Sequence, residues 1–329
     1  MGHKSSLTIA VVLLIGAVIP IFVREYHLNL LTEVFIFALF AVSFNLLLGY
    51  GGLLSFGHGM FFGIGAFVAG VALTHLKGLS LVACLILAVT GTTLIGLVVG
   101  SLLLRLKGGY FAMLTLAFNA LFYAIATKWT AVTGGDDGLN ITRPAVNLFF
   151  TQLKVGSVTS FYYVTLVVIG AVIIFCWYFT HTAMGQTVLL MRENDERMRF
   201  IGYDTAVSRL ILLTFSGALA GLAGAFFALH FQFVSVSAIG LQMGWTALLI
   251  AFVGGTRTFW GPILGAFVYI ILQNYLSDVT DRWALIMGLI FVLMVLFVPG
   301  GLSKVLLDLK SWLVSLSRNR SKTSEERGA

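Results

Sequence analysis

Two polar side chains near the start of the chain have the types and the spacing that covalent catalysis can use. Ser55 and His58 lie three residues apart, so on a helix the hydroxyl and the imidazole would share a face, as a nucleophile and its base do. No third group accompanies them to orient the imidazole, and a polar pair at a helix break is the favoured interpretation. The six histidines are dispersed and Cys84 is far from Cys176, so we expect no metal site, no catalytic centre and no cofactor.

The sequence also lacks the loop that most often cradles nucleotide phosphates. No Gly-x-x-x-x-Gly-Lys-[Ser/Thr] motif occurs, so if ATP drives this protein, another subunit must bind it. Carboxylates deep within apolar runs, which ion-coupled transporters use, are nearly absent: Glu33 is close to the start of a run, and Asp278 and Asp281 lie at a boundary. This weakens, without eliminating, the alternative of a solitary secondary transporter or channel.

Composition defines the class of protein. Of 329 residues, 59% are hydrophobic and 10% are charged, and the mean hydropathy is +1.00. A soluble domain averages about 25% charged residues, so too little charge is present here to cover a surface that faces water. A soluble enzyme, a disordered chain and a nucleic-acid binder are therefore excluded as the main interpretation. The net charge of +7 does not change this, because the basic residues are scattered through short loops and gathered in Lys304–Arg327.

Apolar runs fill most of the chain, and each bilayer-spanning helix needs about 20 apolar residues. The sequence predicts an all-α polytopic membrane protein surrounded by lipid, with a transmembrane domain over 1–302 and a basic tail over 303–329. About ten spans are expected, some of them short or broken at Gly-rich segments. The candidate spans are 7–23, 30–48, 53–75, 79–104, 110–127, 161–180, 210–230, 242–255, 260–277 and 282–298.

The loops predict the orientation. Fourteen of the 20 Lys and Arg residues fall in the set of loops that includes both termini and the polar loop 181–209, and six fall in the other set, which includes 128–160. Because cytoplasmic loops carry the excess of positive charge, we expect the termini and 181–209 in the cytoplasm and 128–160 outside.

Glycine is abundant, with 36 residues, and two regions are denser than helix packing needs. The runs 49–59 and 254–262 combine repeated Gly with polar residues beside or within apolar segments, a pattern typical of broken or re-entrant helices that line a substrate path. The candidate path residues are Asn45, Gly51, Gly52, Ser55, Phe56, His58, Phe61, Gly254, Gly255 and Trp260.

The polar loop 181–209 is the most informative stretch. Residues 186–201 are predicted to form one surface helix with Glu193/Arg197 and Asp195/Arg199 pairs four residues apart. Gly202 could end this helix in a left-handed conformation, and Asp204 could cap the next one. Composition alone supports two interpretations equally: a helix that docks into a partner, or a solvated loop.

Several segments resemble the permeases of branched-chain amino-acid ABC importers, of the LivM type. The matching runs share their order along roughly residues 30–302. They are Asn45–Gly59 with Phe61–Ala66, Thr133–Leu139, Gly185–Gly202 with Phe215–Ala225, and Val253–Gly255 with Trp260–Ala266.

The resemblance implies a pore subunit in a bacterial or archaeal plasma membrane. It would pair with a homologous second permease, bind two cytoplasmic ATPase subunits and accept substrate from an extracytoplasmic binding protein. Glu196 and Gly202 stand where such importers place the Glu and Gly of their coupling loop, although Arg197 and Met198 replace two common alanines. The residues expected to couple to the ATPase are Arg192, Glu193, Glu196, Met198 and Gly202. Relatives of this architecture also carry urea, short amides and other amino acids, and the sequence does not select among these substrates.

Overall fold

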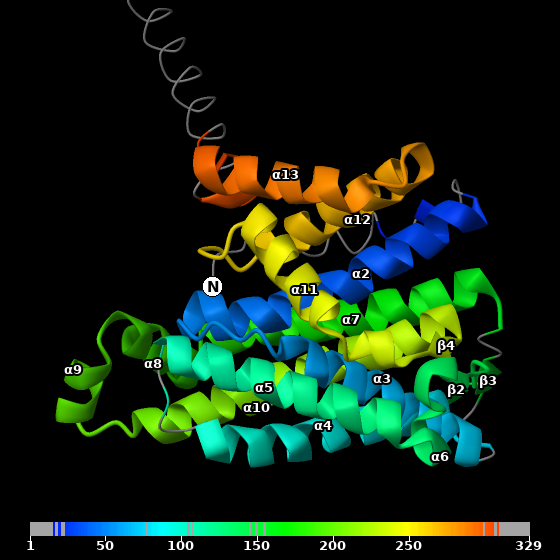
Figure 1. The fold of residues 1–329 in the computed structure, drawn as a ribbon, viewed down its shortest axis with the longest axis horizontal. Coiled ribbons are helices and arrows are strands. Elements are labelled where there is room, and N and C mark those ends of the chain that lie inside the picture. Colours follow the sequence, from blue (N-terminus) through cyan, green and yellow to red (C-terminus); the bar gives the residue numbers. More distant parts are fainter. Residues whose placement is uncertain are drawn as a thin grey trace, which may run out of the picture.

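The structure is a computed structural model, and it describes residues 24–76, 78–103, 106, 108–144, 146–148, 151–153, 156–298, 300–305 and 308, together with Gly16, Ile19 and Pro20. Within these residues the chain is a helical bundle whose long helices mostly run in one direction (Figure 1). Among the described residues, seven helices are long and apolar enough to cross a membrane, by length and composition. They are α2 (Glu25–Asn45), which continues as the π-helical η1 (Leu46–Tyr50), α3 (His58–His75), α4 (Leu81–Leu103), α5 (Gly108–Lys128), α7 (Val158–Thr180), α10 (Thr205–Phe231) and α12 (Gly261–Val279).

Two further apolar helices, α11 (Leu241–Gly254) and α13 (Trp283–Phe297), have 14 and 15 residues. At 1.5 Å per residue both are shorter than the hydrocarbon core of a bilayer, which is about 30 Å thick. The remaining elements are short and connect the long helices. They are α6 (Thr130–Thr133), η2 (Gly135–Asp137), β1 (Leu139–Asn140), β2 (Val146–Leu148), β3 (Thr151–Leu153), α8 (Ala183–Glu193), α9 (Asp195–Phe200), β4 (Phe233–Val234) and η3 (Val236–Ala238).

The centre of the bundle consists of α2, α3 and α10. Most of the apolar length of each of these three helices is buried, whereas α4, α5, α7 and α12 are buried over a third or less. Small residues allow the central helices to approach closely: a Cβ on Gly65 would collide with the backbone of Gly221, and one on Gly224 with the carbonyl oxygen of Phe62. Lipid supplies no hydrophobic force between helices, so this close packing is what holds the centre together.

The two ends of the bundle differ. At one end α8 and α9 project beyond the long helices, and at the opposite end lie α6 and the four short strands (Figure 1). We call these the α8–α9 end and the strand end. At the strand end β1 pairs antiparallel with β4, with Leu139 opposite Val234, and β2 pairs antiparallel with β3.

The structure confirms an all-α membrane bundle, but not the predicted count of ten spans. Nine of the ten candidate segments contain an apolar helix, of which seven have spanning length. The tenth candidate, 7–23, lies almost wholly outside the described residues, as does most of the tail 303–329. The segment expected to begin at residue 53 becomes helical only at His58, because the chain turns through Gly52, whose φ is +66°.

Candidate functional site

The segment at the α8–α9 end consists of two helices, which corrects the prediction of one helix over residues 186–201. α8 ends at Glu193 and α9 begins at Asp195, with Asn194 between them in an extended conformation at φ −155° and ψ 95°. The Asn194 side chain accepts a hydrogen bond from the backbone N–H of Arg197, at 2.9 Å, and so caps α9. The cap ends one helix and starts the next, so Glu193 and Arg197 do not lie on one helix.

The junction from α9 to α10 has the predicted geometry. Gly202 has a φ of +96°. Its N–H donates to the carbonyl oxygen of Arg199, and the N–H of Tyr203 donates to that of Met198, which is the paired arrangement of a Schellman motif. Asp204 then caps α10 by accepting from the N–H groups of Ala206 and Val207.

One ion pair and one hydrogen bond join α9 to α10. The predicted Asp195–Arg199 pair is present, at 3.5 Å. Asp195 also accepts from Arg209 of α10, at 2.5 Å, and Arg199 Nε donates to Thr205 Oγ1 at 2.9 Å. Arg209 was not predicted as a partner of Asp195, because a side chain 14 residues away comes within reach only after the turn at Gly202.

The expected coupling residues differ in how far they are exposed to solvent. Arg192, Glu193 and Glu196 are exposed, whereas Met198 is buried. The most exposed apolar side chains of this segment are those of Phe200, which is 89% exposed, and Ile201, which is 65% exposed. The exposed surface therefore combines charge with apolar area, as a docking surface does.

The two Gly-rich breaks meet each other and α8, although about 200 residues separate them in the sequence. Arg192 of α8 donates a hydrogen bond to the carbonyl oxygen of Gly49, in η1. Gly49 also lies against the second break, since a Cβ there would collide with the carbonyl oxygen of Thr256. The side-chain amide of Asn45 donates to the carbonyl oxygen of Thr258, at 3.3 Å. The candidate coupling segment and the candidate path residues thus share one junction.

The second break is a close backbone crossing. α11 ends at Gly254, Gly255 has a φ of +103°, and α12 begins at Gly261. A Cβ on Gly254 would overlap the carbonyl oxygen of Gly261, and a Cβ on Gly255 would overlap that of Gly300. These glycines therefore allow backbone segments to touch.

Several candidate path residues are buried between helices. Asn45, Ser55, His58 and Phe61 are each at most 1% exposed. The imidazole of His58 pairs through Nε2 with Ser43 Oγ, at 2.9 Å, which favours the interpretation of Ser55 and His58 as structural polar groups. The accessible members of the set are Gly52, Trp260 and, in part, Phe56.

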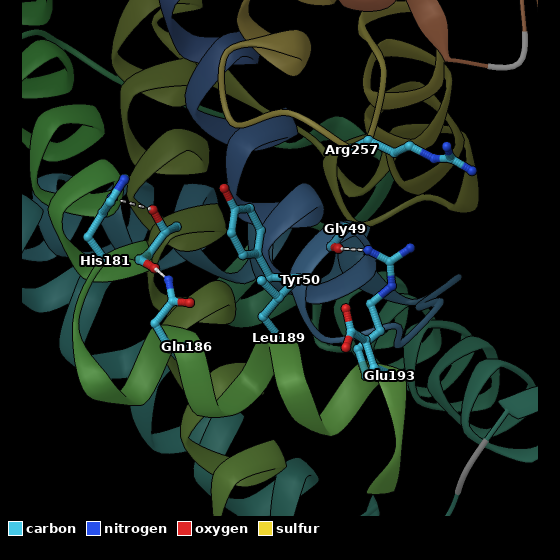
Figure 2. Close-up of a pocket in the computed structure, with 9 residues that line it drawn as sticks. Gly49, Tyr50, His181, Gln186, Leu189, Glu193 and Arg257 are labelled. Atoms are coloured by element: carbon cyan, nitrogen blue, oxygen red, sulfur yellow. Dashed lines mark hydrogen bonds between the residues drawn. The ribbon is translucent and has the colours of Figure 1, made fainter. Parts of the chain in front are cut away.

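A cleft of about 510 Å³ opens beside this junction (Figure 2). Its wall mixes charged, polar and apolar groups from η1, the end of α7, α8 and the second break. Gln186 donates to the carbonyl oxygen of Thr180, at 2.8 Å, and His181 Nδ1 lies 2.8 Å from the carbonyl oxygen of Trp177. The residues that line the cleft are Gly49, Tyr50, Thr180, His181, Gln186, Leu189, Arg192, Glu193 and Arg257. Apart from Arg192 and Glu193, these residues were not among the predicted site residues, because no local motif links α7 to the two breaks.

At the strand end, the loop 128–160 is tied to the central helices. Gly134, Gly135 and Gly138 all have positive φ, and they turn the chain so that Asp136 and Asp137 are exposed. Further along, the guanidinium of Arg143 donates to the last carbonyl groups of α10, those of Leu229 at 2.9 Å and His230 at 2.7 Å. Arg143 also lies over the ring of Phe161, 4.4 Å from its centroid. A cation at the carbonyl end of a helix is electrostatically favourable, so Arg143 fixes this loop to α10.

A family model and several similar permeases show the family to which the chain belongs. Residues 26–298 match the family described as branched-chain amino acid transport system / permease component. The chain is 27% identical to the high-affinity branched-chain amino acid transport system permease protein LivM of Salmonella typhimurium, a match that covers 91% of this chain and 75% of that protein. LivM of Escherichia coli is 26% identical over the same shares. The probable LivM permease of Methanocaldococcus jannaschii is 24% identical over 72% of this chain and 77% of its own. No solved structure matches the chain significantly.

The match extends from the second residue of α2 to the residue after α13, so it includes both breaks, the α8–α9 segment and the loop at the strand end. The resemblance seen in the sequence is thereby confirmed over most of the chain. The chain belongs to the branched-chain amino acid transport system / permease component family, and is a permease-family subunit of a membrane transporter.

Proposed function

We propose that this chain is the transmembrane permease subunit of an ATP-binding-cassette importer, and that it forms part of the path for leucine, isoleucine, valine or a related small polar solute. The family match over residues 26–298 supports this assignment. The observation that carries the mechanism is the α8–α9 segment, which projects from one end of the bundle, is capped at Asn194 and Gly202, and is joined directly to the membrane helix α10. A subunit without a nucleotide-binding loop needs such a segment to receive work from another protein.

In this proposal the α8–α9 end faces the cytoplasm and binds an ATPase subunit through Arg192, Glu193, Glu196 and the exposed apolar side chain of Phe200. Both termini lie on this side. The strand end faces outward and meets an extracytoplasmic substrate-binding protein. A homologous second permease and a second ATPase subunit complete the complex.

The path itself is proposed to pass the junction of the two Gly-rich breaks. Gly52, Phe56 and Trp260 are the accessible groups there, and freed backbone groups at a break can meet the carboxylate and ammonium of an amino acid. The buried members of the candidate set, including Asn45, would hold the two breaks in place.

Reconstitution tests the function. The chain is co-purified with its cognate ATPase and second permease, placed in proteoliposomes, and supplied with the cognate binding protein. We expect uptake of radiolabelled leucine or valine that requires both ATP and the binding protein, with urea and a short amide as competing substrates. Uptake by the chain alone, driven by an ion gradient or by the solute gradient, would instead establish the solitary transporter or channel.

A pair of glycine variants tests the path. In Gly52→Leu the new side chain would enter the junction beside Arg192, and we expect uptake to be abolished while the subunits still assemble. Gly78→Leu is the matched control, because Gly78 also has a positive φ, +84°, but nothing lies within 4 Å of the position that its Cβ would occupy. Equal uptake by the two variants would show that Gly52 lies away from the path.

A further inference from the structure

One carboxylate joins the projecting segment to the membrane helices. Asp195, the first residue of α9, accepts a hydrogen bond from Arg209 Nη2 at 2.5 Å. The side chain of Arg209 is 8% exposed and that of Asp195 is 16% exposed. A guanidinium held this far from water requires a negative partner, and removing that partner leaves a buried charge without compensation.

The short helix α9 depends on this contact for its orientation. It has six residues, fewer than an isolated helix needs to be stable, and Met198 is the one residue of the six that is buried. Its two flanks, the extended Asn194 and the left-handed Gly202, are bends rather than continuous helix. Tertiary contacts must therefore hold α9 in place, and Asp195 supplies a charged one at its first residue.

A second contact, through Arg199, also joins α9 to the start of α10. Arg199 pairs with Asp195 at 3.5 Å and donates from Nε to Thr205 Oγ1, in the first residue of α10. Asp195 therefore lies between two guanidinium groups, one on each helix. This arrangement fixes the angle between α9 and α10.

A displacement of α9 would pass through this joint into the centre of the bundle. α10 has 27 residues and packs against α2, α3 and α4. Its last carbonyl groups accept hydrogen bonds from Arg143 of the strand-end loop. One continuous helix thus connects the ion-paired joint to the opposite end of the molecule.

We propose that Asp195 and Arg209 are positioning residues for energy coupling: their ion pair makes α9 move as one body with α10, so that a push on α9 by the ATPase becomes a movement of the central membrane helices. The part that concerns ATP rests on the function proposed above. The part that concerns the joint is a property of this chain alone.

The joint is tested first without any partner. Spin labels are placed at Phe200→Cys on α9 and Leu102→Cys on α4, both exposed, in the purified full-length chain; the natural cysteines, Cys84 and Cys176, are buried. We expect one narrow distance distribution, and a broad one when Asp195→Ala is added. Asp281→Ala, which removes an exposed carboxylate elsewhere, is the matched control and should leave the distribution narrow. An unchanged distribution in Asp195→Ala overturns the proposal.

Coupling is then measured in the reconstituted complex. We expect Asp195→Ala to retain the ATPase subunits but to lower the amount of solute taken up per ATP hydrolysed about 5-fold, within the range by which single mutations change the coupling between sites. The charge exchange Asp195→Arg with Arg209→Asp should restore most of this ratio, which loss of folding would not allow. The double variant Asp195→Leu with Arg209→Met, in which apolar side chains replace the pair, should fold but stay uncoupled.

These outcomes separate the two proposals. A wild-type ratio of uptake to hydrolysis in both Asp195→Ala and the Leu/Met variant overturns the role in coupling. If the wild-type complex shows no ATP-dependent uptake, the proposed function fails, while the spin-label distances still decide whether the ion pair fixes α9.

Discussion

At the scale of single residues, one backbone conformation decides how the α8–α9 segment joins α10. Gly202 adopts a φ of +96°, and no atom lies within 4 Å of the position that its Cβ would occupy. Any penalty for a side chain there comes from the backbone conformation and not from a collision. This allows the conformation to be tested separately from packing.

Gly202→Val should weaken the joint by about 1–2 kcal/mol, the cost of a left-handed conformation for a residue with a Cβ. We expect the variant to reach the membrane but to retain less ATPase subunit on co-purification. Gly202→Asn is the control, because asparagine adopts this conformation more readily and should retain the ATPase. Equal loss in both variants would show that the backbone conformation is not what matters.

Residue-scale features were predictable where they are local. The cap at Asp204 and the left-handed Gly202 follow from residue types within a few positions of a helix end, and both predictions are confirmed. The Asp195–Arg209 pair was not predictable, because its partners lie 14 residues apart on two different helices.

At the scale of elements, the difference between local signals and distant contacts explains one wrong prediction and one contact that was not predicted. The prediction of a single helix over 186–201 rested on charge pairs four residues apart. The residue that decides the structure is Asn194, which caps a new helix whose first two residues are acidic. The breaks at 49–59 and 254–262 were recognised from glycine content, but their contact through Gly49 and Thr256 depends on how α2 packs beside α11 and α12.

Because α11 and α12 cross at close backbone contact, adding one methyl group at the crossing should lower the stability of the protein. Gly254→Ala places a Cβ against the carbonyl oxygen of Gly261, which is backbone and cannot rotate away, so we expect a loss of about 1–3 kcal/mol in stability. The temperature of half-unfolding in detergent, followed by loss of the monodisperse peak in size-exclusion chromatography, measures it. Gly288→Ala in α13 meets nothing within 4 Å and should be unaffected. A thermostable Gly254→Ala protein would show that the crossing can open.

At the scale of the whole molecule, hydropathy located the helices but overstated how many of them are long enough to span a membrane. Every predicted span within the described residues contains a helix, because an apolar run in lipid has no other way to satisfy its backbone. α11 is nevertheless too short to be counted as a span. Its candidate segment, 242–255, matches the helix to within one residue, but 14 residues span only about 21 Å and the hydrocarbon core is about 30 Å thick.

Cysteine labelling tests the orientation of the molecule. In intact cells a membrane-impermeant maleimide should label Asp137→Cys, in the exposed turn at the strand end, and should label Phe200→Cys only after permeabilisation. Because Cys84 and Cys176 are buried, the wild-type chain is the background control. Labelling of Phe200→Cys in intact cells would reverse the proposed orientation of the molecule.

The exposed pair Phe200 and Ile201 also has a consequence for the lifetime of the protein in the cell. Apolar area that faces water and lacks a partner is a target for chaperones and proteases. Copies synthesised in excess of the proposed ATPase partner should therefore be degraded first, so the amount of this subunit would follow the amount of that partner. In a pulse-chase experiment we expect a shorter half-life when the ATPase gene is deleted, and partial recovery when Phe200→Ser reduces the apolar area. A half-life that is the same with and without the ATPase gene would mean that another contact covers Phe200 and Ile201.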